Sequence, residues 1–246
     1  MDAAAATAAE LVSVASSNKE RAETLGLLAR LNRQSKNLDA AANAYEQAVT
    51  LVGTEGTTAA EFKDLLLEQK LLGEDPRWDY YVGALSGYSD SQSDPRKRSE
   101  IQLEIAQVLA DEMELGERAL HTLQRALAAD VENSALRTEL AKRLRLAGHY
   151  PQALIELRRL LEADVTKIET WGAILECFQG MKRTEEASLA MAPLVALGFA
   201  NDLERATVSS RPSHFARARP QSFDDTAFRG VDSRGADPAL AVLAAI

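Results

Sequence analysis

Residues 134–194, SALRTELAKRLRLAGHYPQALIELRRLLEADVTKIETWGAILECFQGMKRTEEASLAMAPL, contain two similar pairs of predicted helices. Within each pair, a short turn separates two segments whose apolar residues recur every three or four positions, as on one face of a helix. Ala153 and Ala187 hold equivalent places 34 residues apart, and the same step backwards reaches Ala119. A small residue at a fixed place lets two helices approach closely. The stretch therefore predicts a repeated helical hairpin.

The composition favours an all-α fold for the whole chain. Hydrophobic residues make up 46% of the sequence, mostly Ala and Leu, which are strong helix formers. Val and Ile rarely alternate with polar residues, so no β-strand is predicted. The net charge of −9 argues against nucleic acid as the partner, because phosphate binding needs a basic surface.

Three further hairpins are expected before this stretch. The first covers about 18–52 and ends at Gly53, a residue typical of helix ends. The second, within 61–90, has Tyr81 in place of the small residue, which predicts wider packing there. The third covers 96–131. About five hairpins are thus expected in a single domain over residues 19–198.

The two ends of the chain differ from this pattern. Residues 1–18 are Ala-rich and predict a flexible leader or a frayed helix. Residues 199–246 predict an extended segment, locally basic through four arginines, with short capping helices at 224–231 and 238–246; the arginines are Arg205, Arg211, Arg217 and Arg219. The apolar tail either caps the last hairpin or marks a protein that continues beyond it. No signal peptide or membrane span is predicted, so we expect a cytoplasmic protein.

The hairpins resemble the tetratricopeptide repeat (TPR) family. In the fourth hairpin the matching residues are Leu140, Ala141, Leu144, Gly148, Tyr150, Ala153 and Leu157, and in the fifth they are Trp171, Ile174, Phe178, Ala187 and Met191. The closing proline of the family is absent. The resemblance, which extends to TPR modules of large bacterial proteins, implies a right-handed α-solenoid whose first helices line a concave face. Such a face suits an extended peptide or a helix of another protein.

Under that resemblance, polar residues of the first helices should line the groove. The candidates for partner binding are Arg30, Arg33, Gln107, Lys142, Arg145, Glu176 and Gln179. Four of them are basic, which favours an acidic segment in the partner. The alternative is an ordinary solvated helix face. Tyr80 is a further candidate, as an exposed anchor in an aromatic hairpin whose other rings should be packing residues.

No catalytic or cofactor motif is present. Cys177 is the only cysteine, and its position on a repeat helix favours packing over catalysis. His121, His149 and His214 share no metal-ligand spacing. We find no Gly-rich phosphate loop, nucleophile elbow or HExxH motif. The sequence therefore predicts a protein that is not an enzyme and holds no cofactor or metal.

Three functions follow from these observations. The first is a non-catalytic interaction module that binds a partner protein in its groove or along its flank. The second is a structural subunit that assembles through its terminal helices into a homo-oligomer or larger complex. The third, from the resemblance to bacterial arrays, is a regulatory scaffold in motility or polarity.

Overall fold

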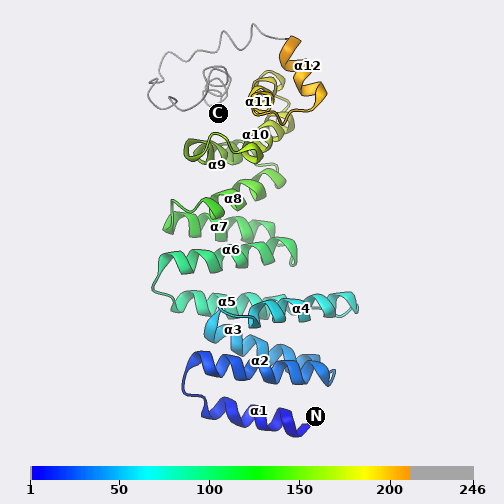
Figure 1. Cartoon of the computed structure of the whole chain (residues 1–246), viewed down its shortest axis with the longest axis vertical. Helices are drawn as coiled ribbons and strands as arrows, with labels where there is room; N and C mark the ends of the chain where they lie inside the picture. Colours follow the sequence, from blue (N-terminus) through cyan, green and yellow to red (C-terminus); the bar gives the residue numbers. More distant parts are fainter. Residues whose placement is uncertain (1, 211–246) are drawn as a thin grey trace. The chain divides into compact units, whose positions relative to one another are not determined.

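The computed structural model describes residues 2–210, which form twelve α-helices and no strand (Figure 1). In chain order these are α1 (Asp2–Val14), α2 (Asn18–Gln34), α3 (Leu38–Val52), α4 (Thr58–Leu71), α5 (Trp78–Ser91), α6 (Pro95–Asp111), α7 (Gly116–Ala129), α8 (Ser134–Leu146), α9 (Tyr150–Ala163), α10 (Ile168–Gly180), α11 (Thr184–Ala196) and α12 (Asp202–Ser210). The predicted all-α chain of five helical hairpins is confirmed over these residues. The hairpins are α2/α3, α4/α5, α6/α7, α8/α9 and α10/α11.

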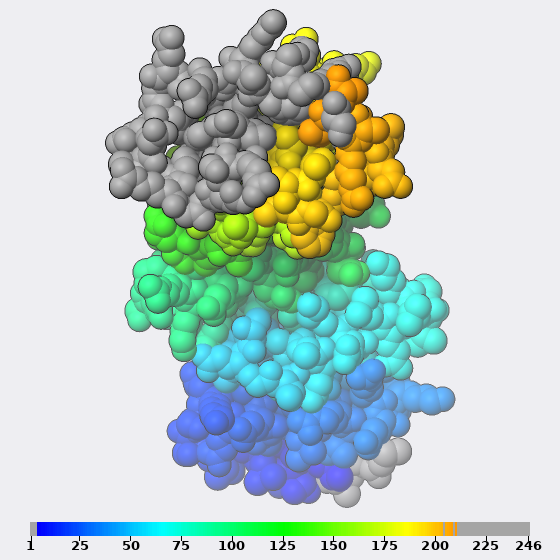
Figure 2. Space-filling model, turned by 45° about the horizontal axis from the view of Figure 1, so that its top comes forward, coloured from blue at the N-terminus to red at the C-terminus, as the bar shows by residue number. Residues whose placement is uncertain are grey.

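The helices divide after Glu132 into two compact units. The first contains α1 to α7, which follow one another in layers from blue to green in Figures 1 and 2. The second begins at Asn133, with α8. The division of the sequence into 1–18, 19–198 and 199–246 stays a prediction.

The Ala-rich stretch at the start of the chain includes α1, which packs against α2. Ala8 is buried, and Val12 packs against a cluster formed by Ala22, Leu25 and Ala48. Alanine is the strongest helix former, and here its small side chain also lets α1 lie close to α2. The described part of this stretch is therefore a helix with a buried face.

The small residues that revealed the repeat are all buried in second helices. Ala41, Ala119 and Ala153 have no exposed surface, and Ala187 is also buried. Tyr81 holds the corresponding place in α5 and is buried as well. The large Tyr81 side chain takes the place of a small residue, and α4 and α5 accordingly approach each other much less closely than α2 and α3 do.

The turn inside a hairpin is closed mainly by backbone hydrogen bonds. After α8, Gly148 has a left-handed conformation (φ 79°), and His149 N donates to Leu144 O at 2.8 Å. This is the Schellman arrangement, and it recurs after α2, α4, α10 and α11. Glycine holds the left-handed place after α4, α8 and α11, but the turns after α2 and α10 use Lys36 and Lys182. The turn after α6 is one residue longer and places Glu114 there, while Gly116 begins α7.

Exchanging residues between two of these turns should shift stability in opposite directions. Lys182→Gly should stabilise the fold by about 0.5–1 kcal/mol, because it relieves a left-handed backbone that lysine tolerates poorly. Gly148→Lys should destabilise it by about 1 kcal/mol, since nothing lies within 4 Å of the added Cβ and backbone strain alone remains. Thermal unfolding followed by circular dichroism measures both. Equal midpoints for the two variants would contradict this account of the turns.

The end of the described chain contains Pro193 and α12. Pro193 lies inside α11, which continues through it to Ala196. α12 packs against α11. The predicted capping helices at 224–231 and 238–246, with Arg211, Arg217 and Arg219, lie outside the described residues. No helix within 2–210 is both long and apolar enough to cross a bilayer.

Candidate partner-binding face

The first helices of neighbouring hairpins are joined by ion pairs that follow one rule. Between α2 and α4, Arg30 Nε lies 3.1 Å from Glu61 Oε2, and Arg33 Nη2 lies 2.6 Å from Glu68 Oε2. In each pair the cation is on the earlier helix and the glutamate on the later one. The cations of α2 are therefore used to hold the next hairpin.

The same rule applies to the next step and recurs in the second unit. Lys63 Nζ of α4 lies 2.8 Å from Glu104 Oε1 of α6. Lys70 Nζ of α4 lies 3.1 Å from Glu112 Oε2, which follows α6 directly. In the second unit, Arg145 of α8 forms an ion pair with Glu176 of α10. These pairs link helices whose backbones make few close approaches, so long side chains bridge the gap.

Two of the glutamates also accept a hydrogen bond from a tyrosine of the preceding second helix. Tyr45 of α3 donates to Glu61 Oε2 at 3.1 Å, and Tyr81 of α5 donates to Glu104 Oε1 at 3.1 Å. Each glutamate thus joins three helices. Burial, followed by the neighbouring carboxylate charge, raises the pKa of Tyr45 to about 12 and also raises the pKa of Tyr81.

These tyrosines make the fold sensitive to alkali. The folded protein keeps the Tyr45 proton to a higher pH than the unfolded chain, whose tyrosine pKa is about 10. The stability that this proton contributes is present below pH of about 10 and is lost as the pH rises towards about 12. Tyr45→Phe should therefore reduce the fall in thermal midpoint over that range, as measured by thermal unfolding at a series of pH values. Identical alkaline profiles for wild type and Tyr45→Phe would contradict this linkage.

An aromatic chain lies beneath these links in the first unit. The ring centroids of Tyr45 and Phe62 are 5.9 Å apart, and those of Phe62 and Tyr81 are 5.6 Å apart. Trp78 meets Tyr81 edge to face at 6.1 Å. All four rings are buried, so the sequence-based view that the rings of this hairpin other than Tyr80 are packing residues holds for Trp78 and Tyr81.

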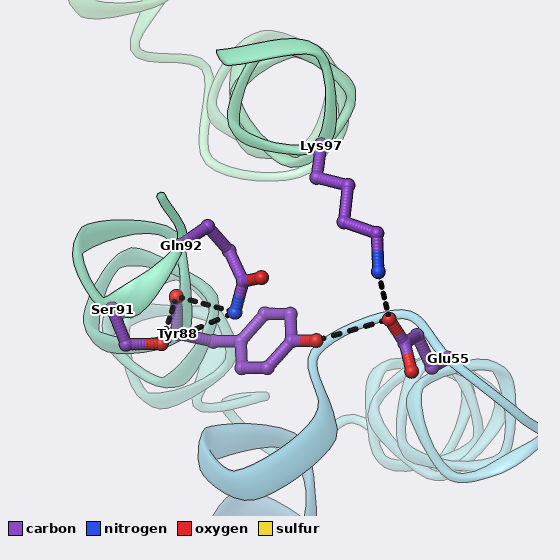
Figure 3. Close-up of polar contacts among 5 residues, drawn as sticks. All are labelled: Glu55, Tyr88, Ser91, Gln92 and Lys97. Carbon is purple, nitrogen blue, oxygen red and sulfur yellow. Dashed lines mark hydrogen bonds and ion pairs between the residues drawn. The ribbon is translucent and has the colours of Figure 1, made fainter. Parts of the chain in front are cut away.

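A separate contact ties the loop after α3 to α5 and α6. Figure 3 shows Glu55 between Tyr88, whose hydroxyl donates at 3.2 Å, and Lys97, whose Nζ lies 3.0 Å away. The hydrogen bond and charge of Lys97 lower the pKa of Glu55. The Tyr88 ring lies against Gly53, where an added Cβ would come within 2.1 Å of the ring. Gly53 also has φ 58° and ψ −126°, a combination that is almost confined to glycine.

Two alanine substitutions in this loop separate the ring contact from backbone strain. Gly53→Ala should destabilise the fold by about 2–3 kcal/mol, because it adds a steric conflict with Tyr88 to the strain of a positive φ. Gly56→Ala has the same kind of strain (φ 86°) but meets nothing within 4 Å, so its cost should be only about 1 kcal/mol. Thermal unfolding of both variants provides the comparison. Equal losses would show that the Tyr88 contact contributes nothing.

Exposed leucines lie between the rows of ion pairs in the first unit. The edges of α4 are occupied by its pairs with α2 and α6, and the helical period places Asp64, Leu67 and Leu71 on the outward face between them. Leu67 is 39% exposed and Leu71 is 89% exposed. Leu27 of α2 is 43% exposed. We call the outward surface of α2, α4 and α6 the first-helix face.

The structure separates the site residues predicted from the sequence. Arg30 and Arg33 lie on α2, and half-buried Gln107 lies on α6. In the second unit, Lys142 is exposed and its Nζ lies 3.7 Å from Glu139 Oε1 of the same helix. Their positions on first helices agree with the repeat register, but Arg30, Arg33, Lys142 and Arg145 all have an acidic neighbour within the chain.

The remaining predicted residues are placed differently. Glu176, the ion-pair partner of Arg145, and Gln179 are exposed on α10. Tyr80 belongs to α5, a second helix, and is half-buried. The Arg77 guanidinium carbon lies 3.5 Å from the centre of the Tyr80 ring, so one face of that ring is already covered. The role of all these residues in binding stays a prediction.

Sequence reasoning missed the leucines of the first-helix face. The signal was present in DLLLEQKLL, where five leucines fall within one short helix and its cap. A single buried stripe uses Leu65 and Leu66. Leu67 and Leu71 are in excess of what that stripe needs, and such an excess points to a surface apolar patch.

The described residues offer little reactive chemistry. Cys177 is buried, and burial raises the pKa of its thiol to about 11, so its nucleophilic thiolate is scarce at neutral pH. Within residues 2–210, no group of three His, Cys, Asp or Glu side chains could hold a metal ion. The first-helix face combines exposed leucines with charged side chains.

Comparison with known proteins finds similarity among solved structures. No protein-family model matches the chain, and no curated protein matches it. Among solved structures, the chain is similar to YrrB, described as a TPR protein with an unusual peptide-binding site. The identity is 14%, the TM-score is 0.49, and the match covers 76% of this chain and 91% of YrrB.

Proposed function

We propose that this chain is a non-catalytic protein-interaction module whose first-helix face binds a segment of a partner protein. The observation that carries the proposal is the exposure of Leu67 and Leu71 between the two rows of ion pairs of α4, together with exposed Leu27 on α2. Exposed leucines on adjacent helices of a firmly linked frame are typical of interfaces that bind an apolar side chain of a partner.

The charges of this face indicate the chemistry of that segment. Arg30, Arg33, Lys63 and Lys70 are each paired with a glutamate of the chain. By contrast, Glu23, Asp64 and Glu100 are exposed and form no ion pair within the described residues. An apolar segment with basic flanks fits this arrangement better than the acidic segment expected from the sequence. Assembly through the terminal helices, a motility scaffold and a cytoplasmic location stay predictions.

Removing two leucines tests the proposal. Leu67→Ser with Leu71→Ser should weaken partner binding at least about tenfold, because two apolar anchors of about 1 kcal/mol each are lost. Stability should change little, since both side chains are exposed. The measurement is affinity capture from the source cells with quantitative mass spectrometry, followed by the Kd for a peptide from the captured partner.

The matched control is Ile155→Ser, which removes a 52% exposed apolar side chain from α9, a second helix. It should leave capture and Kd unchanged. If the leucine variant binds as tightly as wild type while its thermal midpoint is unchanged, the first-helix face is not the binding surface.

A further inference from the structure

A second, separate groove lies between α5 and α7 and has α6 as its floor. It consists of two hollows of about 530 and 260 Å³ that both include Asp90, Gln102 and Arg125, so the two are continuous. By contrast, α3 and α5 pack directly against each other. The groove therefore opens where the regular packing of second helices in the first unit is interrupted.

The floor of the larger hollow is apolar. Val82 of α5 and Ile105 and Leu109 of α6 line it, and each is at most 9% exposed. These side chains belong to the edge of the hydrophobic core and offer a surface for apolar groups of a ligand. A site for a small, fully hydrated anion would have no need of such a floor.

The wall formed by α7 carries three basic side chains beside one acidic residue, Glu117. Arg118, His121 and Arg125 line the hollow at helical spacings i, i+3 and i+7, which places them along one face. Arg118 and Arg125 are exposed and form no ion pair within residues 2–210. Arg30, Arg33, Lys63 and Lys70 of the first-helix face are paired with glutamates, whereas these two arginines of α7 keep their charge available to a ligand. Arg98 of α6 adds a further guanidinium to the smaller hollow.

We propose that the α5–α7 groove binds an acidic amphipathic segment of a partner protein. Its carboxylates would pair with Arg118 and Arg125, and its apolar side chains would cover Val82, Ile105 and Leu109. The two arginines are separated by two helical turns, or about 10 Å along α7. A partner helix that carries acidic residues at i and i+7, with leucines between them, matches both the spacing and the floor.

The basic residues of α7 and the apolar floor of the groove together favour a protein segment over nucleic acid as the ligand. Binding of single-stranded nucleic acid uses a basic channel with aromatic side chains on which bases stack, and no Phe, Tyr or Trp lines either hollow. The acidic segment expected from the sequence therefore has its best-supported place here. This proposal depends on residues other than the leucines of the first-helix face. An experiment can therefore contradict the groove proposal without contradicting the proposed function, and the reverse.

The test uses a synthetic probe and charge reversal. A fluorescent helical peptide with Glu at i and i+7 and Leu at i+3 and i+4 is titrated against the full chain by fluorescence anisotropy. Arg118→Glu with Arg125→Glu should raise its Kd at least about tenfold. The control, Arg21→Glu with Arg159→Glu, changes the net charge equally at exposed arginines elsewhere and should change Kd less than about twofold.

Four further measurements complete the test, the last being competition by a single-stranded oligonucleotide. A peptide with Lys in place of Glu should bind the Arg118→Glu, Arg125→Glu variant more tightly than it binds wild type. Replacing the peptide leucines with serine should abolish binding. Leu67→Ser with Leu71→Ser should leave the Kd for the acidic peptide unchanged, which separates this groove from the first-helix face. The proposal is overturned if the acidic peptide fails to bind wild type or if a single-stranded oligonucleotide displaces it. It is also overturned if the Arg21→Glu, Arg159→Glu control loses as much affinity for the peptide as the Arg118→Glu, Arg125→Glu variant does.

Discussion

The first unit depends on glutamates that each join three helices. Glu61 receives the Arg30 cation from one helix and the Tyr45 hydroxyl from another, and Glu104 receives Lys63 and Tyr81 in the same way. The aromatic rings that carry these hydroxyls pack on Phe62, so the polar link and the buried core form one continuous contact. A hairpin has too little apolar surface to be stable alone, and these shared residues are where it is joined to its neighbour.

This linkage also determines which charges remain available at the surface. Arg30, Arg33, Lys63 and Lys70 are used between first helices, so these four cations are not available to a partner at the first-helix face. On α7, Arg118 and Arg125 have no such structural use within the described residues. The pairing of charges thus underlies the different binding chemistry that we propose for these two surfaces of the first unit.

The repeat was predictable because it depends on size and spacing. Ala119, Ala153 and Ala187 must be small for the helices to pack, and that need is visible as a step of 34 residues. The partners of surface charges were not predictable, because Arg30 and Glu61 belong to different helices and their meeting depends on the angle between hairpins. Lys36 and Lys182 could not be identified as left-handed either, since the backbone hydrogen bonds that enforce this conformation leave no mark on the side chain.

The Schellman turns have a consequence for how such a chain changes over evolutionary time. Backbone groups make the closing hydrogen bonds, so the side chains of the turn are not needed to close it. The presence of glycine in some of these turns and lysine in others illustrates this. An extra residue is absorbed at the turn after α6 while Ala119 remains buried in α7. Insertions of residues can therefore accumulate in the turns without changing the packing of the helices. A repeat protein can in this way vary the sequence of its turns while its core residues stay the same.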